Sequence, residues 1–332
     1  MYVTKENQLN NLIGMKKIIK VSIMPENADM TRYISDSFFK DFQFEINNQA
    51  CNQCDFWVVF TDKPGGSEKV YINPDHVFFI DPEIDGFYSR SFLDQFSKVI
   101  TADTHYKGAN ITYNYLGLPW FVQKKFDDLF SQENINKSKN LSVIVSDLSK
   151  ITMTRNYKIR YNFVQELIRH FGKNIDLYGR GFNMIPDKGQ GLWSYKFSVA
   201  LENSPTHYLF SEKIADCLLT HTYPFYWGCP NIYSFFPEGS YTMLDIMDIK
   251  YSIDLIEKIL NTPNFYEDHL DVLIRAKKKY LMEYSFQAVI VNLCKAYEEE
   301  AGQKKWVKIS PNNKLRSRIK IRSINTIFNF LK

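Results

Sequence analysis

The sequence predicts an α/β fold with two domains, followed by helices toward the C-terminal end. The chain has 332 residues, which is more than one small hydrophobic core usually serves. Short apolar runs alternate with helical patterns in both halves, as in parallel α/β sheets. A polar stretch at 126–139 separates the halves. We therefore expect an N-terminal domain at 1–138, a second domain at 139–302 and a basic tail at 303–332.

The first half contains four apolar runs that predict strands. The run DFWVVFT is continuous, as expected for a strand that is covered on both faces. Phe38, Phe39 and Phe42 lie on one side of a helical pattern, which predicts a helix around them. The predicted strands are 17–24, 55–61, 76–80 and 98–102, and the predicted helices are 31–42 and 91–97.

The second half repeats this alternation of strands and helices. Tyr161, Val164, Leu167 and Ile168 have helical spacing. Beyond 252 the pattern is helical to about 301. The predicted strands are 141–146, 175–178, 195–201 and 223–227, and the predicted helices before residue 252 are 157–171 and 211–220.

Charge is concentrated at the C-terminal end. The net charge is +4, but residues 303–332 hold nine basic residues and no acidic one, so the rest carries −5. A nucleic-acid-binding body would carry its own basic face, so no nucleic acid is expected as a partner. The chain has no apolar run of membrane-spanning length, and its first residues lack the pattern of a signal peptide. We expect a cytoplasmic protein with reduced thiols.

The cysteines indicate neither zinc binding nor redox catalysis. Cys51 and Cys54 form a CxxC pair, but a second pair at zinc spacing is missing. The pair precedes a strand, whereas a redox pair would begin a helix. There is also no Asp-x-Asp motif or His/Cys cluster, so no metal site is predicted. We interpret the pair as two thiols at the entrance of a strand.

The segment 195–231 is the most informative part of the chain. It reads as strand, polar loop, helix, strand and glycine turn. Ser211 stands at the expected N-cap, and Glu212 and Lys213 follow in the first helical turn. A helix N-terminus at the carboxyl end of a strand suits a phosphate group, and Lys213 could neutralise a pyrophosphate. On these three residues alone, plain helix capping is the simpler interpretation.

The whole segment closely resembles the donor-binding motif of the family 10 glycosyltransferases, the α1,3/α1,4-fucosyltransferases. Several blocks match in order over about 37 residues, which is far more specific than a single glycine motif. A weaker likeness covers most of 141–240. The matching blocks are Tyr195-Lys196-Phe197, Leu201-Glu202-Asn203-Ser204, Ser211-Glu212-Lys213 and Tyr226-Trp227-Gly228-Cys229-Pro230.

This resemblance implies a GT-B fold, in which two Rossmann-like domains face each other across a cleft, and an inverting transfer of L-fucose from GDP-fucose to a hydroxyl of a glycan acceptor. No cofactor is required, and a divalent metal is compatible but not indicated. Asn203, Glu212 and Lys213 are implied to bind the GDP-sugar, with Lys213 and Arg160 on the diphosphate and Glu212 on ribose or fucose hydroxyls. Arg155 competes with Arg160 for this role. The donor-binding set is Arg160, Glu202, Asn203, Tyr208, Ser211, Glu212 and Lys213.

An inverting transferase also needs a general base for the acceptor hydroxyl. The resemblance places it just after a strand of the first domain, where the chain reads Asp81-Pro82-Glu83. Asp81 aligns best and Glu83 second. A plain turn explains the same residues about equally well.

Departures from the family motif leave the donor sugar open. Leu209 stands where the family has tyrosine, with Tyr208 one place early, and Ser211 replaces threonine. Another GDP-deoxyhexose or a GDP-heptose is therefore an alternative donor. A non-catalytic glycan-binding protein on the same scaffold is a second alternative.

The end of the chain, 314–332, reads KLRSRIKIRSINTIFNFLK. Apolar residues recur there at mostly helical intervals with basic residues between them, which is typical of an amphipathic helix on an anionic membrane surface. A helix packed on the body or a solvated tail would fit the pattern as well. Together with the resemblance, this favours a peripheral protein on the inner face of the membrane that acts in lipopolysaccharide or capsule synthesis.

Overall fold

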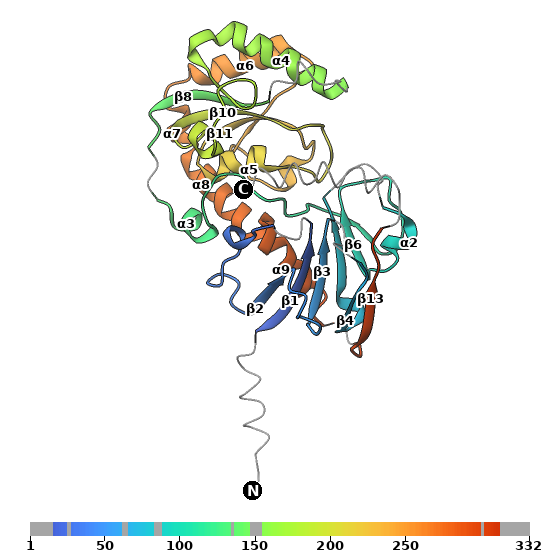
Figure 1. Ribbon diagram of the computed structural model, residues 1–332. Coiled ribbons are helices and arrows are strands. Elements are labelled where there is room, and N and C mark those ends of the chain that lie inside the picture. The colour runs from blue at the N-terminus through green and yellow to red at the C-terminus, as the bar shows by residue number, and fades with distance from the viewer. Residues whose placement is uncertain are drawn as a thin grey trace. The chain divides into compact units, whose positions relative to one another are not determined.

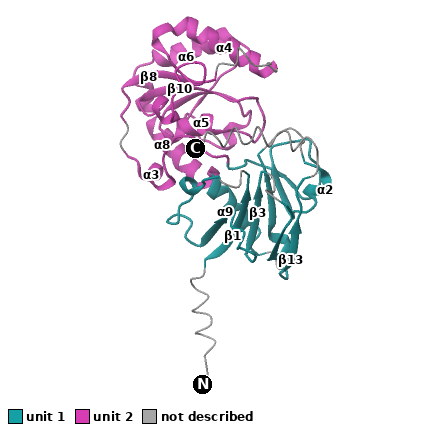
Figure 2. Cartoon of the chain, viewed as in Figure 1, with its two compact units in different colours: residues 1–117, 286–332 teal, residues 118–285 magenta. Residues whose placement is uncertain are grey.

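The structure, a computed structural model, describes residues 16–24, 28–61, 66–82, 88–133, 136–146, 155–299 and 302–312. It divides the chain into two compact units, residues 1–117 with 286–332 (unit 1) and residues 118–285 (unit 2) (Figure 2). This division differs from the predicted domains, because the chain enters unit 2 about twenty residues before 138 and returns to unit 1 at Phe286.

Unit 1 is built on a six-stranded parallel sheet with the order β2-β1-β3-β5-β6-β7. A two-stranded antiparallel sheet, β4 with β13, lies in the same unit. The strands of the large sheet are β1 (Lys17–Ile23), β2 (Phe42–Ile46), β3 (Phe56–Phe60), β5 (Val77–Asp81), β6 (Lys98–Thr101) and β7 (Ile111–Tyr113), and those of the small sheet are β4 (Glu68–Ile72) and β13 (Lys305–Ile309).

Alternate residues of β3 and β5 bury both faces of the large sheet. Trp57 and Phe79 join a buried cluster with helix α2 (Arg90–Leu93) and the small sheet. On the opposite face, the Phe60 ring packs edge-on against Phe286, at the start of helix α9 (Phe286–Ala296), with centroids 5.2 Å apart. The side chain of Gln287 holds α9 further, since it is hydrogen-bonded to both backbone groups of Ser35.

Unit 2 is built on a five-stranded parallel sheet with the order β12-β11-β10-β8-β9. Helix α5 packs on β10 and β11, and α8 packs on α5, whereas α4 lies beside α6 on the other face (Figure 1). The strands are β8 (Lys139–Ile144), β9 (Asp176–Tyr178), β10 (Tyr195–Leu201), β11 (Tyr223–Trp227) and β12 (Thr242–Met243). The helices are α3 (Phe126–Ser131), α4 (Arg155–Phe171), α5 (Glu212–Leu219), α6 (Ile249–Leu260), α7 (Phe265–Asp268) and α8 (Leu270–Lys279), followed by a π-helix at Tyr280–Tyr284.

Both parallel sheets share one strand order. With the strands numbered within each sheet, the sheet of unit 2 runs 2-1-3-4-5 and that of unit 1 runs 2-1-3-4-5-6. In both, the order reverses between the first and third strands. Open α/β sheets bind ligands at the carboxyl ends of strands beside such a switch point. In unit 2 the switch point lies between β8 and β10. The predicted GT-B class, with two Rossmann-like domains and C-terminal helices, is confirmed.

Three local predictions are corrected by the structure. The helix predicted at 31–42 is wrong: a 3-10 turn spans Thr31–Tyr33, and β2 begins at Phe42, because the alternation FQFEI has the period of a strand. The helical region beyond 252 ends at Ala296, not near 301. The basic tail does not begin at 303, because Lys305–Ile309 is strand β13 of unit 1. The predicted amphipathic segment 314–332 lies outside the described residues.

Cys51 and Cys54 lie just before β3, as predicted, and both are free thiols. Burial raises the pKa of Cys54 to about 12, so this thiol is a poor nucleophile. Within the described part of the chain, no helix is both long and apolar enough to cross a membrane.

Candidate functional site

The candidate site lies at the carboxyl end of β10, next to the switch point in the sheet of unit 2. Strand β10 ends at Leu201, and Glu202 follows it directly. The chain then crosses a loop to Ser211, the N-cap of α5. Because β10 pairs with both β8 and β11 in parallel register, the loop that joins β10 to α5 leaves the sheet where ligands bind in this fold.

Glu202 fixes the start of α5. It is 5% exposed, and its two carboxylate oxygens accept hydrogen bonds from the backbone N–H (2.8 Å) and the hydroxyl (2.6 Å) of Ser211. The Tyr226 hydroxyl lies 3.5 Å from the same carboxylate. A Cβ atom at Gly228 would overlap Glu202 Cγ and the Tyr226 hydroxyl. The glycine of the predicted motif is therefore required by this close approach.

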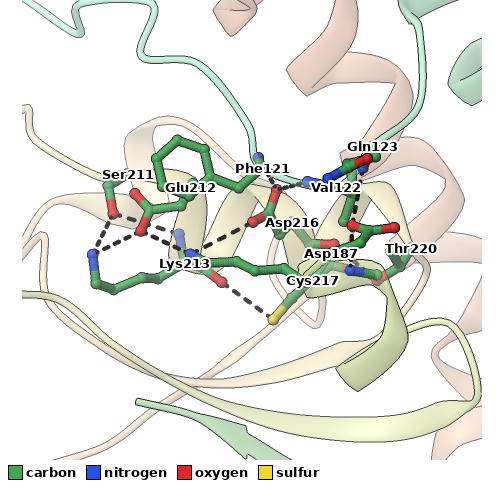
Figure 3. Close-up of polar contacts among 12 residues, drawn as sticks. Phe121, Val122, Gln123, Asp187, Ser211, Glu212, Lys213, Asp216, Cys217 and Thr220 are labelled. Carbon is green, nitrogen blue, oxygen red and sulfur yellow. Dashed lines mark hydrogen bonds and ion pairs between the residues drawn. The ribbon is translucent and has the colours of Figure 1, made fainter. Parts of the chain in front are cut away.

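Lys213 lies in the first turn of α5, among acidic partners. Its Nζ donates to Glu212 Oε1 at 3.1 Å and to the Ser211 hydroxyl at 3.1 Å (Figure 3), and it lies 3.5 Å from Glu202 Oε2. Burial alone would lower the pKa of Lys213, but Glu212 and Glu202 outweigh burial and raise it. The lysine is therefore a fixed cation at the positive end of a helix dipole.

Arg160 reaches the same loop from α4. Its guanidinium donates through Nη1 to Asn203 Oδ1 at 2.8 Å, and its side chain is buried. The Nε atom of Arg160 has no hydrogen-bond partner within the described part of the chain. Arg155, the alternative considered from the sequence, is exposed at the first residue of the helix. The structure thus brings Arg160, and not Arg155, to the β10–α5 loop.

Tyr208 occupies the middle of this loop in a strained conformation. Its φ is 63°, in the left-handed region that few residues other than glycine adopt. The backbone N–H of Tyr208 donates to Asn231 Oδ1 at 3.0 Å, and Asn231 follows the glycine turn after β11. The ring of Tyr208 is half-buried.

Lys188 and Asp216 were missed from the sequence. Lys188 Nζ lies 2.9 Å from Glu212 Oε1 and 3.8 Å from Asp216 Oδ2. Asp216 Oδ1 accepts the backbone N–H groups of Phe121 (2.8 Å) and Val122 (3.2 Å) (Figure 3). Burial alone would raise the pKa of Glu212, but Lys188 and Lys213 outweigh it and hold the pKa below its usual range. Asp216 stands one helical turn after Glu212, the only signal by which it could have been found.

The predicted base candidates lie in unit 1. Asp81 is the last residue of β5, is 1% exposed, and accepts a hydrogen bond of 3.3 Å from the Thr101 hydroxyl. Glu83 lies outside the described residues. Among the described residues, no group of three or more His, Cys, Asp or Glu side chains is placed to hold a metal ion.

The site in unit 2 is suited to bind a diphosphate. Three cations (Arg160, Lys188 and Lys213) surround a helix N-terminus. Asn203 holds Arg160, and the carboxylates of Glu202, Glu212 and Asp216 hold the two lysines. An incoming diphosphate could replace carboxylates as the partner of Lys213. Cations at this position would also stabilise the negative charge that develops on a departing nucleoside diphosphate.

Comparison with known proteins agrees with this geometry. The family model "Glycosyltransferase family 10 (fucosyltransferase) C-term" matches residues 135–312, more than half of the chain. The alpha-(1,3)-fucosyltransferase FucT of Helicobacter pylori is 33% identical over 91 residues, which are 27% of this chain and 19% of that protein. The match therefore spans about a fifth of that relative's length.

Solved structures give a wider but fainter likeness. A crystal structure of an alpha1,3-fucosyltransferase with GDP is 18% identical, with a TM-score of 0.47, and the alignment covers 82% of this chain and 93% of that one. A structure of an alpha1,3-fucosyltransferase with GDP-fucose is 17% identical, with a TM-score of 0.49, over 87% and 93% of the two chains. On the extent of the family match and the motif at β10–α5, the chain belongs to glycosyltransferase family 10, the fucosyltransferases.

Proposed function

We propose that this chain transfers L-fucose, with inversion, from GDP-fucose to a hydroxyl of a glycan acceptor, in α1,3 or α1,4 linkage. The observation that carries the proposal is the arrangement at the start of α5, where Lys213 and the Arg160–Asn203 pair lie beside the N-terminus of the helix. The family and the alpha-(1,3)-fucosyltransferase relative support the donor and the linkage.

In this mechanism different groups act on the donor and on the acceptor. Lys213 and Arg160 bind the diphosphate and stabilise the charge that GDP gains as it departs. The carboxylate of Glu212 accepts hydrogen bonds from ribose or fucose hydroxyls. Asp81 or Glu83 takes the proton from the acceptor hydroxyl as its oxygen attacks the anomeric carbon. Attack from the face opposite GDP inverts the configuration at that carbon.

Calorimetric titration of the full chain with GDP tests the donor site. We expect the wild-type protein to bind GDP and Lys213→Ala to bind it about ten- to hundredfold more weakly, as expected for losing charge-assisted contacts with phosphate. Lys250→Ala is the matched control, because Lys250 is an exposed lysine of the same unit that pairs with Asp254 on α6. Equal affinity of the wild-type protein and Lys213→Ala, or no heat with GDP, would refute the proposal.

A panel of GDP-sugars with galactose and N-acetylglucosamine acceptors tests the reaction. GDP-fucose should give released GDP and a product of the expected mass. Turnover with another GDP-deoxyhexose or a GDP-heptose, and not with GDP-fucose, would change the proposed donor to that sugar nucleotide. GDP binding without any turnover, together with no effect of Asp81→Ala or Glu83→Ala, would favour a non-catalytic glycan-binding protein.

We also propose that the basic end of the chain attaches the enzyme to the inner face of the cell membrane, where lipopolysaccharide or capsule is assembled. Residues 303–332 include nine basic and no acidic residues, and six of the nine follow β13. Anionic lipid attracts such a segment by about 1 kcal/mol per basic residue near the surface. The segment that would bind begins after β13, since Lys305–Ile309 belongs to the fold of unit 1.

A further inference from the structure

Lys188 is a cation of the site that stands outside the motif at β10–α5. It begins the 3-10 helix Lys188–Gly191, which precedes β10. Its Nζ donates to Glu212 Oε1 at 2.9 Å and lies 3.8 Å from Asp216 Oδ2. The same ammonium group lies 4.6 Å from the centre of the Phe121 ring. Lys188 thus bridges two carboxylates one turn apart on α5.

The backbone around Lys188 is held in place by hydrogen bonds that do not involve the donor site. Asp187 Oδ1 accepts the N–H of Gly189 at 2.8 Å and the N–H of Gln123 at 3.0 Å (Figure 3). The Gln123 side chain returns a hydrogen bond of 3.1 Å to the carbonyl of Pro186. These contacts fix the start of the 3-10 helix to the segment at 121–123. Lys188 is therefore anchored from outside the β10–α5 loop.

Glu212 receives two lysines on one oxygen. Lys188 and Lys213 both donate to Oε1, at 2.9 Å and 3.1 Å. Lys213 is also attracted to Glu202, 3.5 Å away, so its charge is divided between two carboxylates. When a diphosphate draws Lys213 away, Glu212 would become a poorly compensated charge in a buried place unless a second cation stays with it.

We propose that Lys188 is a positioning residue of the donor site, which holds the Glu212 carboxylate through Oε1 so that Lys213 is free to neutralise a diphosphate. This inference rests on the proposed function. In the bound state Lys188 keeps its bond to Glu212, and the second oxygen of Glu212 faces the hydroxyls of the nucleotide sugar. The role of Lys188 is indirect, because it acts through Glu212 and not on the phosphates.

A simpler role for Lys188 would be to neutralise the buried Asp216 alone. The distances favour Glu212, since the ammonium group is 2.9 Å from Glu212 and 3.8 Å from Asp216. If Lys188 acts through Glu212, removing Lys188 should change GDP affinity only while the Glu212 carboxylate is present. If it acts through Asp216, the change should depend on the Asp216 carboxylate instead. A double-mutant cycle separates them, because an effect that passes through one partner disappears when that partner is neutralised.

The test measures the dissociation constant for GDP and the KM and kcat for GDP-fucose in Lys188→Met, Lys188→Arg, Glu212→Gln and the double variant Lys188→Met with Glu212→Gln. We expect Lys188→Met to weaken GDP binding and to raise KM about tenfold, roughly the effect of 1.4 kcal/mol. The change in kcat should be less than about threefold, because Lys188 acts on binding. Lys188→Arg should restore most of the affinity, since it keeps the cation.

The cycle decides the mechanism. In the Glu212→Gln background, Lys188→Met should have no further effect on GDP affinity. An undiminished tenfold loss in that background would overturn the inference. So would a loss that disappears when Lys188→Met is combined with Asp216→Asn, measured in the same way. A merely structural role would lower thermal stability and active fraction without this dependence on Glu212.

The outcome is distinguishable from failure of the proposed function. If the wild-type protein binds no GDP, the donor site itself is refuted. If the wild-type protein binds GDP and Lys213→Ala does not, but Lys188→Met binds as tightly as the wild-type protein, only the role of Lys188 is refuted.

Discussion

Asp216→Asn should change how stability depends on pH. Asp216 is 1% exposed on α5, and burial raises its pKa from 3.8 to about 7. Its Oδ2 atom has no hydrogen-bond partner within the described part of the chain. The folded protein therefore binds the carboxyl proton more tightly than the unfolded chain does. A carboxyl group whose pKa is raised by folding makes its full contribution to the free energy of unfolding at low pH. This contribution is lost as the pH rises from about 4 through 7.

The magnitude follows from the size of the shift. A change from 3.8 to about 7 corresponds to about 4 kcal/mol of unfolding free energy in total, of which about 2.5 kcal/mol would be lost between about pH 5 and pH 8. The asparagine oxygen can still accept the N–H groups of Phe121 and Val122, so the variant should keep these contacts without the buried charge. Its stability relative to the wild-type protein should therefore increase by roughly this amount over the same range.

Urea denaturation of both proteins at about pH 5, 6, 7 and 8 measures this difference. Asp254→Asn is the control, because Asp254 is exposed on α6, where it pairs with Lys250. Its curve should run parallel to that of the wild-type protein. A parallel curve for Asp216→Asn as well would refute the reasoning, since it would show that Asp216 is ionised in the folded protein across this range.

Two further predictions concern the glycine turn and the end of the chain. Gly228→Ala should cost about 1–3 kcal/mol of stability and weaken GDP binding, because the new methyl group displaces Glu202 from Ser211. The control in thermal unfolding and GDP titration is Gly66→Ala, whose Cβ would meet no atom within 4 Å. Equal behaviour of the two variants would contradict the prediction. Deleting 313–332 should move the protein from anionic vesicles to the supernatant in a sedimentation assay while leaving β13 and the unfolding temperature intact, and unchanged partition would contradict membrane contact through this segment.

Four of the five strands of unit 2 could be predicted because their signals are local, whereas the two-residue strand β12 was missed. Strand β10 spans 195–201 and β11 spans 223–227, as the apolar runs predicted. The predicted helix 211–220 agrees with α5 because Ser211 is a strong N-cap. The fold class followed from the alternation of these elements. The group at β10–α5 could be assembled from one contiguous segment, since the loop and helix that carry it are adjacent in sequence.

The contacts that could not be predicted join distant parts of the chain. Lys188 and Glu212 are 24 residues apart, and no spacing rule links a 3-10 helix to a later α-helix. Strand β13 pairs with β4 across more than two hundred residues, so its short alternating pattern was interpreted as part of the tail. The helix expected at 31–42 failed for another reason, because Phe42, assigned there to a helical face, instead begins the strand alternation of β2 together with Phe44.

The return of the chain at Phe286 bears on the order in which the protein can be completed during synthesis. Unit 2 is one continuous stretch, 118–285, whereas unit 1 needs α9 and β13 from the last fifty residues. Domains generally fold as units while the chain emerges from its N-terminus. We therefore expect unit 2 to complete its fold before unit 1. Unit 1 must wait, with the apolar residues Val70 and Ile72 of β4 without their partner strand, until β13 has been synthesised.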